Sequence, residues 1–284
     1  MRLRSSGPER FSPAALIAFY VTLGIFLVWL LFPIYWMIVT SFKPDNLIIR
    51  IPPGWLPTAY LGQYQRIFRT LHFAVFLGNN FWVAGWATFI TMLAAILAGY
   101  GLSRYRTVLG TVLLYGLLST QMFPVIGIVI SLYALYIRVG MLDTHTGLIL
   151  VLAATAVPFS TLLMKGFFDD MPKSMEESAR VDGAGRITIL FRIVLPLSKP
   201  GLLASGLFAF MLAWDDFLFA LTLIRSEFLR TLSVGISMRY VGQIGFEWGR
   251  IATASFLGAL PMFILFFIFQ AYLVQGLTAG AVKG

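Results

Sequence analysis

Long runs without a single charged side chain dominate this sequence and determine its fold class. Nearly every run is long enough to cross a hydrocarbon layer, which needs roughly 20 apolar residues in a helix. Membrane β-strands would alternate apolar and polar residues over about ten positions, and these runs do not. We therefore expect an all-α, polytopic membrane bundle of six transmembrane helices, over residues 11–42, 70–103, 107–137, 144–164, 200–224 (interrupted by two aspartates) and 251–282.

Composition excludes several other classes of protein. Only 12% of the residues are charged, whereas a soluble domain carries about 25%. The absence of cysteine excludes disulfides, thiol nucleophiles and cysteine-bound metals, and the two histidines, His72 and His145, lie too far apart to predict a metal site. The net charge of +9 is spread between the apolar runs, so we assign it to membrane topology rather than to nucleic-acid binding.

The N-terminal run is predicted to be a retained span. It follows Arg2, Arg4 and Arg10 and is far longer than the 7 to 15 apolar residues of a secretory signal. The distribution of Lys and Arg weakly favours cytoplasmic termini. We expect a cytoplasmic N-terminus over residues 1–13, one six-span transmembrane domain over 14–275 and a cytoplasmic tail over 276–284. The proline-rich segment 43–76, including a short helix near 64–68, is expected outside, over the pore mouth.

Residues 167–199 form the most polar segment of the chain. Ser174 and Glu177 have the spacing of a capping box, and Gly183 stands where a helix would end in a left-handed residue. This predicts a helix over 175–182, and a second helical stretch over 186–195 that ends at Pro196. A two-turn helix is marginal in isolation, so we expect it to be supported by the bundle or by another protein.

The predicted helix carries small side chains among charged ones. Ala179 and Gly183 share a face, and small residues allow a neighbouring backbone to approach closely. We interpret this surface as a docking site, and an ordinary cytoplasmic loop with some helicity remains the alternative. The candidate residues are Glu176, Glu177, Ser178, Ala179, Arg180, Asp182, Gly183 and Ala184.

The spacing of the polar segment resembles a known family signature. Glu177-Ser178-Ala179, three residues, Gly183, nine residues and the run 193–196 are similar to the EAA loop of bacterial ABC importer permeases. Other pieces along the chain resemble the MalG-like permeases of carbohydrate-uptake importers, and the tail predicts that the chain is complete. Those pieces are residues 41–44, 55–58, 99–104, 214–217 and 276–284, with departures at Ser178, where the family most often has alanine, and at Asp215 and Asp216, where it has Asn-Glu.

The resemblance implies a type I importer permease fold and a subunit of an ATP-driven importer in the bacterial inner membrane. It also implies two ATP-binding subunits, a second related permease and an extracytoplasmic sugar-binding protein as partners. ATP and Mg would be bound by the ATPase subunits and no cofactor by this chain, which would not be an enzyme. The sequence agrees, since it contains no G-x-x-x-x-G-K-[ST] phosphate loop. The eight residues named above would then transmit ATPase movement.

Polar residues within the runs are candidates for a substrate pathway. Asp215 and Asp216 interrupt an apolar run, and acidic side chains at bilayer depth are costly and by default functional. Hydration near the outer interface is the alternative. Other polar residues could bind a sugar or tie helices together, and the second use is commoner. The candidates are Asn80, Gln121, Trp214, Asp215 and Asp216.

Three alternatives remain at this stage. The cargo could be a sugar or oligosaccharide, a polyol or a glycerol phosphate, and the sequence does not decide between them. An ion-coupled secondary transporter would more usually show internal repeats or mid-membrane charges. A membrane-embedded enzyme would need metal ligands, a thiol or a catalytic triad, and none is evident.

Overall fold

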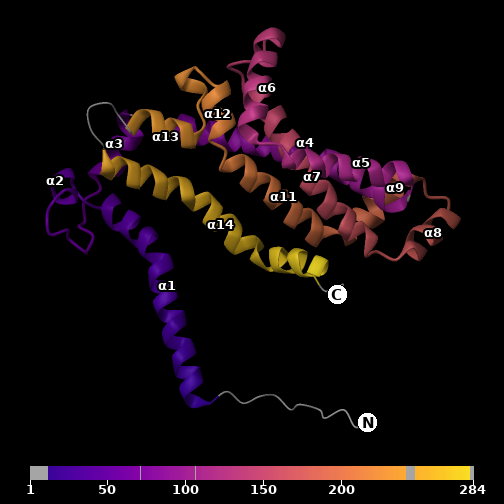
Figure 1. Ribbon diagram of the computed structural model, residues 1–284, viewed down its shortest axis with the longest axis horizontal. Coiled ribbons are helices and arrows are strands. Elements are labelled where there is room, and N and C mark those ends of the chain that lie inside the picture. Colours follow the sequence, from indigo (N-terminus) through magenta and orange to yellow (C-terminus); the bar gives the residue numbers. More distant parts are fainter. Residues whose placement is uncertain (1–11, 71, 106, 241–246, 282–284) are drawn as a thin grey trace.

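The computed structural model describes residues 12–70, 72–105, 107–240 and 247–281, and every regular element in these ranges is helical (Figure 1). The elements are α1 (Pro13–Ser41), α2 (Asp45–Ile48), α3 (Gly62–Thr70), α4 (Phe73–Arg104), α5 (Val108–Ser119), η1 (Thr120–Met122), α6 (Val125–Val139), α7 (His145–Asp169), α8 (Lys173–Val181), α9 (Arg186–Ile189), η2 (Leu190–Val194), α10 (Leu195–Leu197), α11 (Lys199–Trp214), α12 (Leu218–Leu223), η3 (Glu227–Leu229), α13 (Leu232–Tyr240) and α14 (Trp248–Ala281).

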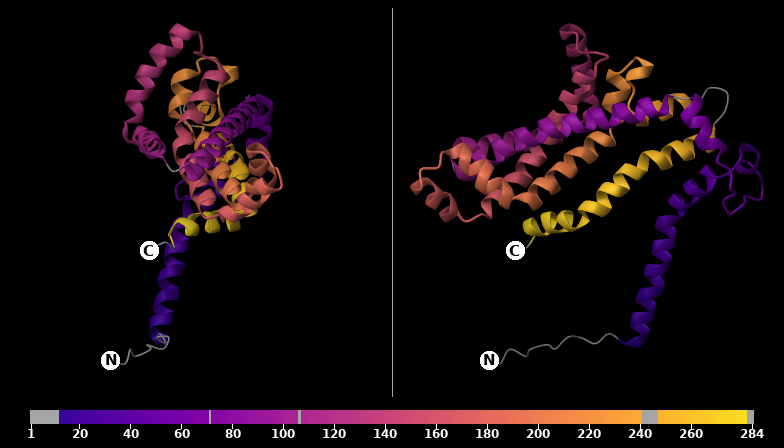
Figure 2. Two further views of the ribbon diagram at one scale, coloured as in Figure 1. Left: turned by 90° about the vertical axis from the view of Figure 1, so that its right-hand side faces the viewer. Right: turned by 180° about the vertical axis from the view of Figure 1, so that it is seen from behind.

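The core of the bundle is formed by α4, α7 and α11, which pack along one another, with α14 beside α11 (Figures 1 and 2). Small residues on α4 allow this close packing. Ala84, Ala87 and Ala95 are buried, and a Cβ at Gly99 would lie only 3.0 Å from the backbone nitrogen of Lys165 on α7. The two helices therefore form a tightly packed pair.

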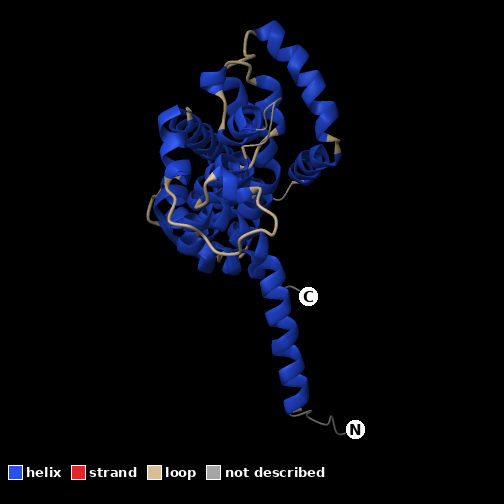
Figure 3. Cartoon of the chain, turned by 90° about the vertical axis from the view of Figure 1, so that its left-hand side faces the viewer, coloured by secondary structure: helices blue, strands red, loops and turns tan. Residues whose placement is uncertain are grey.

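Helix α1 leaves the bundle. Its C-terminal residues Val39, Thr40 and Ser41 are buried, where the helix packs on α14, but none of its most hydrophobic window is buried. The rest of the helix extends away from the other elements (Figures 2 and 3). This long apolar helix therefore presents almost its whole circumference to its surroundings.

The described residues contain four continuous helices long and apolar enough to cross a membrane, and six spans if each bent pair counts as one. The predicted helical membrane bundle is thus confirmed, and the third and fifth predicted spans are both broken. The third bends by 97° between η1 and α6, at Pro124, whose ring cannot continue a helical ladder. In the fifth, α11 ends at Trp214 and the aspartates separate it from the short α12.

Two expected segments can be compared with the described residues. The short helix expected near residues 64–68 lies within α3. The expected tail over 276–284 begins as helix, because α14 continues to Ala281. The remainder of that tail, 282–284, and residues 1–11 of the expected N-terminal segment lie outside the described residues.

Candidate functional site: the α8 segment and the pockets of the bundle

The short helix α8 lies at one end of the bundle, away from α2 and α3 (Figure 1). It begins at Lys173, two residues earlier than predicted, because Pro172 takes the N-cap position with φ −59° and no side chain caps the helix. The predicted capping box is therefore wrong. Ser174 lies inside the first turn, where its carbonyl accepts a hydrogen bond from Ser178 Oγ at 3.0 Å.

The C-terminal end of α8 agrees with the prediction. Gly183 has φ +85°, a left-handed conformation that favours glycine. Its N–H donates to Arg180 O at 3.0 Å, and Ala184 N–H donates to Ala179 O at 2.9 Å. These two bonds make a Schellman motif, which satisfies the last carbonyls of the helix.

Glu176 does not lie among the exposed charges of α8, contrary to expectation. Its carboxylate accepts hydrogen bonds from Arg104 Nε at 2.5 Å and from Tyr100 Oη at 2.8 Å, both on the last turns of α4. The side chains of Arg104 and Glu176 are only 7% and 4% exposed, and Arg180 Nη2 lies 3.7 Å from the same carboxylate. Glu176 is thus an internal anchor of the helix.

The predicted patch of small residues is divided, since its two alanines face the bundle while Ser178 and Gly183 are exposed. Ala179 and Ala184 are half-buried and pack on the apolar cluster that includes Ala95, Met164 and Phe168. The exposed face instead carries Glu177, Ser178, Arg180, Asp182 and Gly183.

Two apolar residues that the sequence reasoning missed are also exposed on this segment. Val181 is 88% exposed and Ile187 is 75% exposed. Apolar residues within a polar segment were the signal that could have identified them.

The predicted helix end at Pro196 is wrong. The helical path runs through η2 and α10 to Leu197, and the break comes at Ser198, with an 84° bend into α11. Because η2 is a π-helical segment, the chain at Pro196 does not depend on a regular i to i−4 bond.

Three of the pathway candidates meet at the other end of α11. Asn80 Nδ2 donates to Trp214 O at 3.3 Å, and Asn80 Oδ1 accepts from Leu232 N at 3.4 Å. Asn80 therefore ties α4 to α11 and α13, as the structural alternative expected. Asn80, Trp214 and Asp215 line a cavity of about 360 Å³, together with Ser233 of α13 and Ser255 of α14.

The other two candidates line a separate cavity of about 600 Å³ between α5, α6, α7 and the end of α11. Asp216 accepts backbone N–H bonds from Phe219 at 3.3 Å and Ala220 at 2.9 Å, and so caps α12. Gln121 donates to Thr155 O at 2.8 Å. The five candidates are thus divided between two cavities by the break at Asp215 and Asp216.

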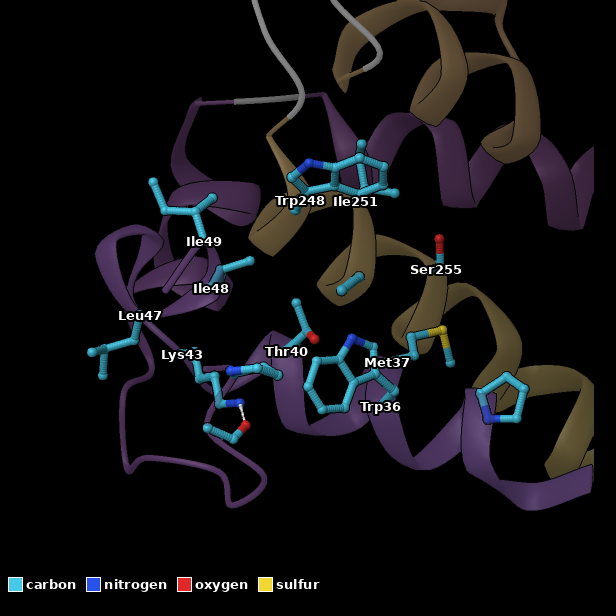
Figure 4. A pocket seen from close by; sticks show the side chains of 14 residues that line it. Trp36, Met37, Thr40, Lys43, Leu47, Ile48, Ile49, Trp248, Ile251 and Ser255 are labelled. Atoms are coloured by element: carbon cyan, nitrogen blue, oxygen red, sulfur yellow. Dashed lines mark hydrogen bonds between the residues drawn. The ribbon is translucent and has the colours of Figure 1, made fainter. Parts of the chain in front are cut away.

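A third cavity, of about 560 Å³, was not anticipated from the sequence. It lies between the C-terminal part of α1, α2 and the start of α14 (Figure 4). Lys43 donates to Gly54 O and lies 5.0 Å from the centroid of the Trp36 ring, and burial lowers its pKa. Apolar side chains make up most of the remaining lining, and the described residues hold no cluster of three metal-binding side chains.

Comparison with known proteins covers most of the chain. Residues 90–279 match the family model of binding-protein-dependent transport system inner membrane components. The sulfoquinovosyl glycerol transport system permease SmoH of Agrobacterium fabrum is 36% identical over 93% of each chain. The trehalose/maltose transport system permease MalG of Thermococcus litoralis is 35% identical over 89% of this chain and 92% of its own. The diacetylchitobiose uptake system permease DasC of Streptomyces coelicolor is 34% identical over 93% and 96%.

A solved structure has the same fold. A chain of a bacterial ABC transporter involved in the import of the acidic polysaccharide alginate superposes with a TM-score of 0.82, at 22% sequence identity. The match covers 93% of this chain and 99% of that one. The overall helical architecture of this chain is therefore one that a solved transporter chain also adopts.

Proposed function

The chain belongs to the family of binding-protein-dependent transport system inner membrane components, and we propose that it carries a sugar or an oligosaccharide as one of two permeases of its importer. The resemblance to MalG-like permeases is thereby confirmed, and with it the function as a permease subunit of an ABC importer. The near full-length similarity to SmoH, MalG and DasC carries the proposal of the cargo class, since the names of all three specify a carbohydrate cargo.

The partners follow from this function. The chain assembles with two ATP-binding subunits, which hold ATP and Mg, with a second related permease and with an extracytoplasmic binding protein. It binds no cofactor and catalyses no reaction of its own. Its termini and the segment 167–199 face the cytoplasm. The position of α8 at one end of the bundle supports this arrangement (Figure 1), as does the uncovered surface of α1.

The coupling surface is the exposed face of α8 and the turn that follows it. Glu177, Ser178, Arg180, Asp182 and Gly183 contact an ATPase subunit there, together with Val181. Glu176 and the two alanines support this surface from beneath. A protein contact explains why Val181 is exposed so fully, because exposed apolar side chains that gather on one segment mark interaction sites.

Reconstitution tests the proposal directly. The assembled transporter is placed in proteoliposomes with its binding protein, and ATP-dependent uptake of maltose, trehalose, diacetylchitobiose, mannitol and glycerol 3-phosphate is measured. We expect uptake of one carbohydrate and none of glycerol 3-phosphate. Uptake of glycerol 3-phosphate alone or of mannitol alone would show that the cargo is not a sugar or an oligosaccharide. Uptake without ATP would show that ATP hydrolysis does not drive transport.

The coupling surface has its own test. In Gly183→Trp the indole projects from the turn at the tip of α8, where a Cβ at this position meets nothing within 4 Å in the isolated chain. We expect normal membrane insertion with loss of ATP-driven uptake or loss of the ATPase subunit on purification. Coupled transport at the wild-type rate would show that the turn does not contact the ATPase.

A further inference from the structure

The anchor of α8 extends beyond the contact between Glu176 and α4. Arg104 Nη1 donates to Phe168 O at 2.7 Å and to Ser103 Oγ at 2.9 Å. Ser103 Oγ in turn donates to Asp169 Oδ1 at 2.7 Å. Phe168 and Asp169 are the last residues of α7, so one buried guanidinium joins the ends of α4 and α7 to the middle of α8.

This polar cluster, which we call the Arg104 cluster (Tyr100, Ser103, Arg104, Asp169 and Glu176), fixes a helix that otherwise packs little. Among the described residues, α8 shares no extensive packing interface with another element, and only Ala179 contributes to the apolar cluster beneath it. Removing one partner of a buried ion pair leaves an uncompensated charge. A movement of α8 away from α4 therefore meets a resistance that the sparse apolar contacts could not supply.

Helix α4 connects this cluster with the far end of the molecule. Its 32 residues correspond to about 48 Å of helix. Near its other end, Asn79 Nδ2 donates to Phe228 O at 2.7 Å and to Arg230 O at 3.0 Å, and Asn80 bonds to α11 and α13. Close packing of α4 on α7 at Gly99 keeps the two helices together.

From this geometry we infer that the Arg104 cluster locks α8 to α4 and α7 as one rigid body, so that a displacement of α8 by the ATPase reaches the cavity at Asn80, Trp214 and Asp215. The inference rests on the proposed function, because it needs an ATPase that moves α8. Arg104, Tyr100 and Glu176 are positioning residues in this mechanism. They fix the orientation of α8 relative to α4 and α7, and they contact neither nucleotide nor cargo.

Distance measurements between spin labels test the rigid body. This chain contains no cysteine, so label pairs can be introduced at its exposed sites without removing any of its own thiols. One pair joins Leu97 on α4 to Ser174 on α8, and a second joins Ser174 to Ile264 on α14. In the complete transporter we expect the Leu97 to Ser174 distance to be the same without nucleotide and with ADP trapped by vanadate, while the Ser174 to Ile264 distance shifts.

Variants then address the cluster itself. In Glu176→Gln we expect the Leu97 to Ser174 distribution to broaden and to shift with nucleotide, because Arg104 loses its charged partner. If Glu176→Gln fails to fold, Tyr100→Phe removes one hydrogen bond and keeps the buried ring. Glu247→Gln is the matched control, because it removes one carboxylate of another 2.5 Å ion pair at the opposite end of the bundle. We expect it to leave the distance between the labels unchanged.

Two outcomes would overturn the inference. One is a wild-type Leu97 to Ser174 distance that changes with nucleotide as much as the Ser174 to Ile264 distance. The other is a Glu176→Gln distribution that matches that of Glu247→Gln. Failure of the proposed function gives a different result, namely that no ATPase subunit copurifies with the wild-type chain or that neither distance responds to nucleotide.

Discussion

At the scale of single residues, Gly183 offers a test of how much the left-handed backbone conformation contributes to the stability of α8. Both Gly183 and Gly185 have open space for a Cβ, but only Gly183 has a positive φ. Gly183→Ala should destabilise the end of α8 by about 1 to 2 kcal/mol, the cost of a left-handed conformation in an L-residue. Hydrogen exchange of the α8 amides measures this, and Gly185→Ala is the control that should exchange as slowly as wild type.

Asp143 links two loops that lie far apart in the sequence. Its Oδ1 accepts from the backbone N–H groups of Arg225 at 2.8 Å and Ser226 at 2.9 Å, and its Oδ2 accepts from Ser226 Oγ. Burial raises the pKa of Asp143, but these hydrogen bonds outweigh it and leave the pKa below its ordinary value. The carboxylate thus holds the loop before α7 against the loop after α12.

This lowered pKa predicts an acid-dependent stability. A carboxyl group whose pKa is lower in the folded state stabilises the fold above its unfolded pKa of about 3.9, and this contribution is lost as the pH falls through the folded value. Asp143→Asn, which tolerates the positive φ of this position, should therefore lower the melting temperature at pH 7. Below about pH 4 the difference from wild type should shrink. A difference that is constant with pH would show that the charge is not responsible.

At the scale of helices, the pair α4 and α7 depends on Gly99. A Cβ there would lie 3.0 Å from Lys165 N and from Met164 Cβ, whereas a Cβ at Gly101 meets nothing within 4 Å. We expect Gly99→Leu to separate the helices and to cost about 1 to 3 kcal/mol, as overpacking does. Thermal unfolding in detergent, with Gly101→Leu as the control on the same helix, measures the difference. Equal stability of the two variants would show that α4 and α7 do not pack closely there.

The helix ends show what could be predicted from sequence and what could not. The left-handed end at Gly183 follows from one residue type at one position, so the prediction succeeded. The start of α8 failed because Pro172 opened the helix before Ser174 could cap it. Pro196 failed as a stop because it lies in the first turn of α10, directly after the π-helical segment, where a missing N–H is tolerated. The inward direction of Glu176 depends on Arg104, 72 residues earlier in the chain, and no local pattern contains that information.

At the scale of the whole molecule, the exposed α1 predicts a subunit contact. Val28 is 70% exposed, and most other apolar side chains of this helix are also exposed, though less fully. A benzophenone attached at Val28→Cys should crosslink to the second permease in the assembled transporter. The matched site is Ile137→Cys on α6, which is 54% exposed and rises from the opposite side of the bundle (Figures 1 and 2). Crosslinking at position 137 alone would place the second permease on the other side.

The membrane bundle itself was predictable because apolar runs report directly on burial in lipid. The break of the fifth span at the two aspartates was also visible in the sequence, but the angles of the bends at Pro124 and before α11 were not, since packing fixes them. The division of the pathway candidates between two cavities follows from the same break. Composition therefore predicted the class of molecule, and tertiary contacts decided the local shape.

The exposed Val181 at the end of α8 has a consequence for the stability of the subunit in the cell. Val181 is almost fully exposed in the isolated chain, and exposed apolar side chains are what chaperones and proteases recognise in incompletely folded chains. On the proposed coupling, docking of the ATPase would cover Val181, so orphaned copies would be open to degradation while completed transporters would be spared. The same tip that receives mechanical force would then also help to keep the numbers of the different subunits in balance.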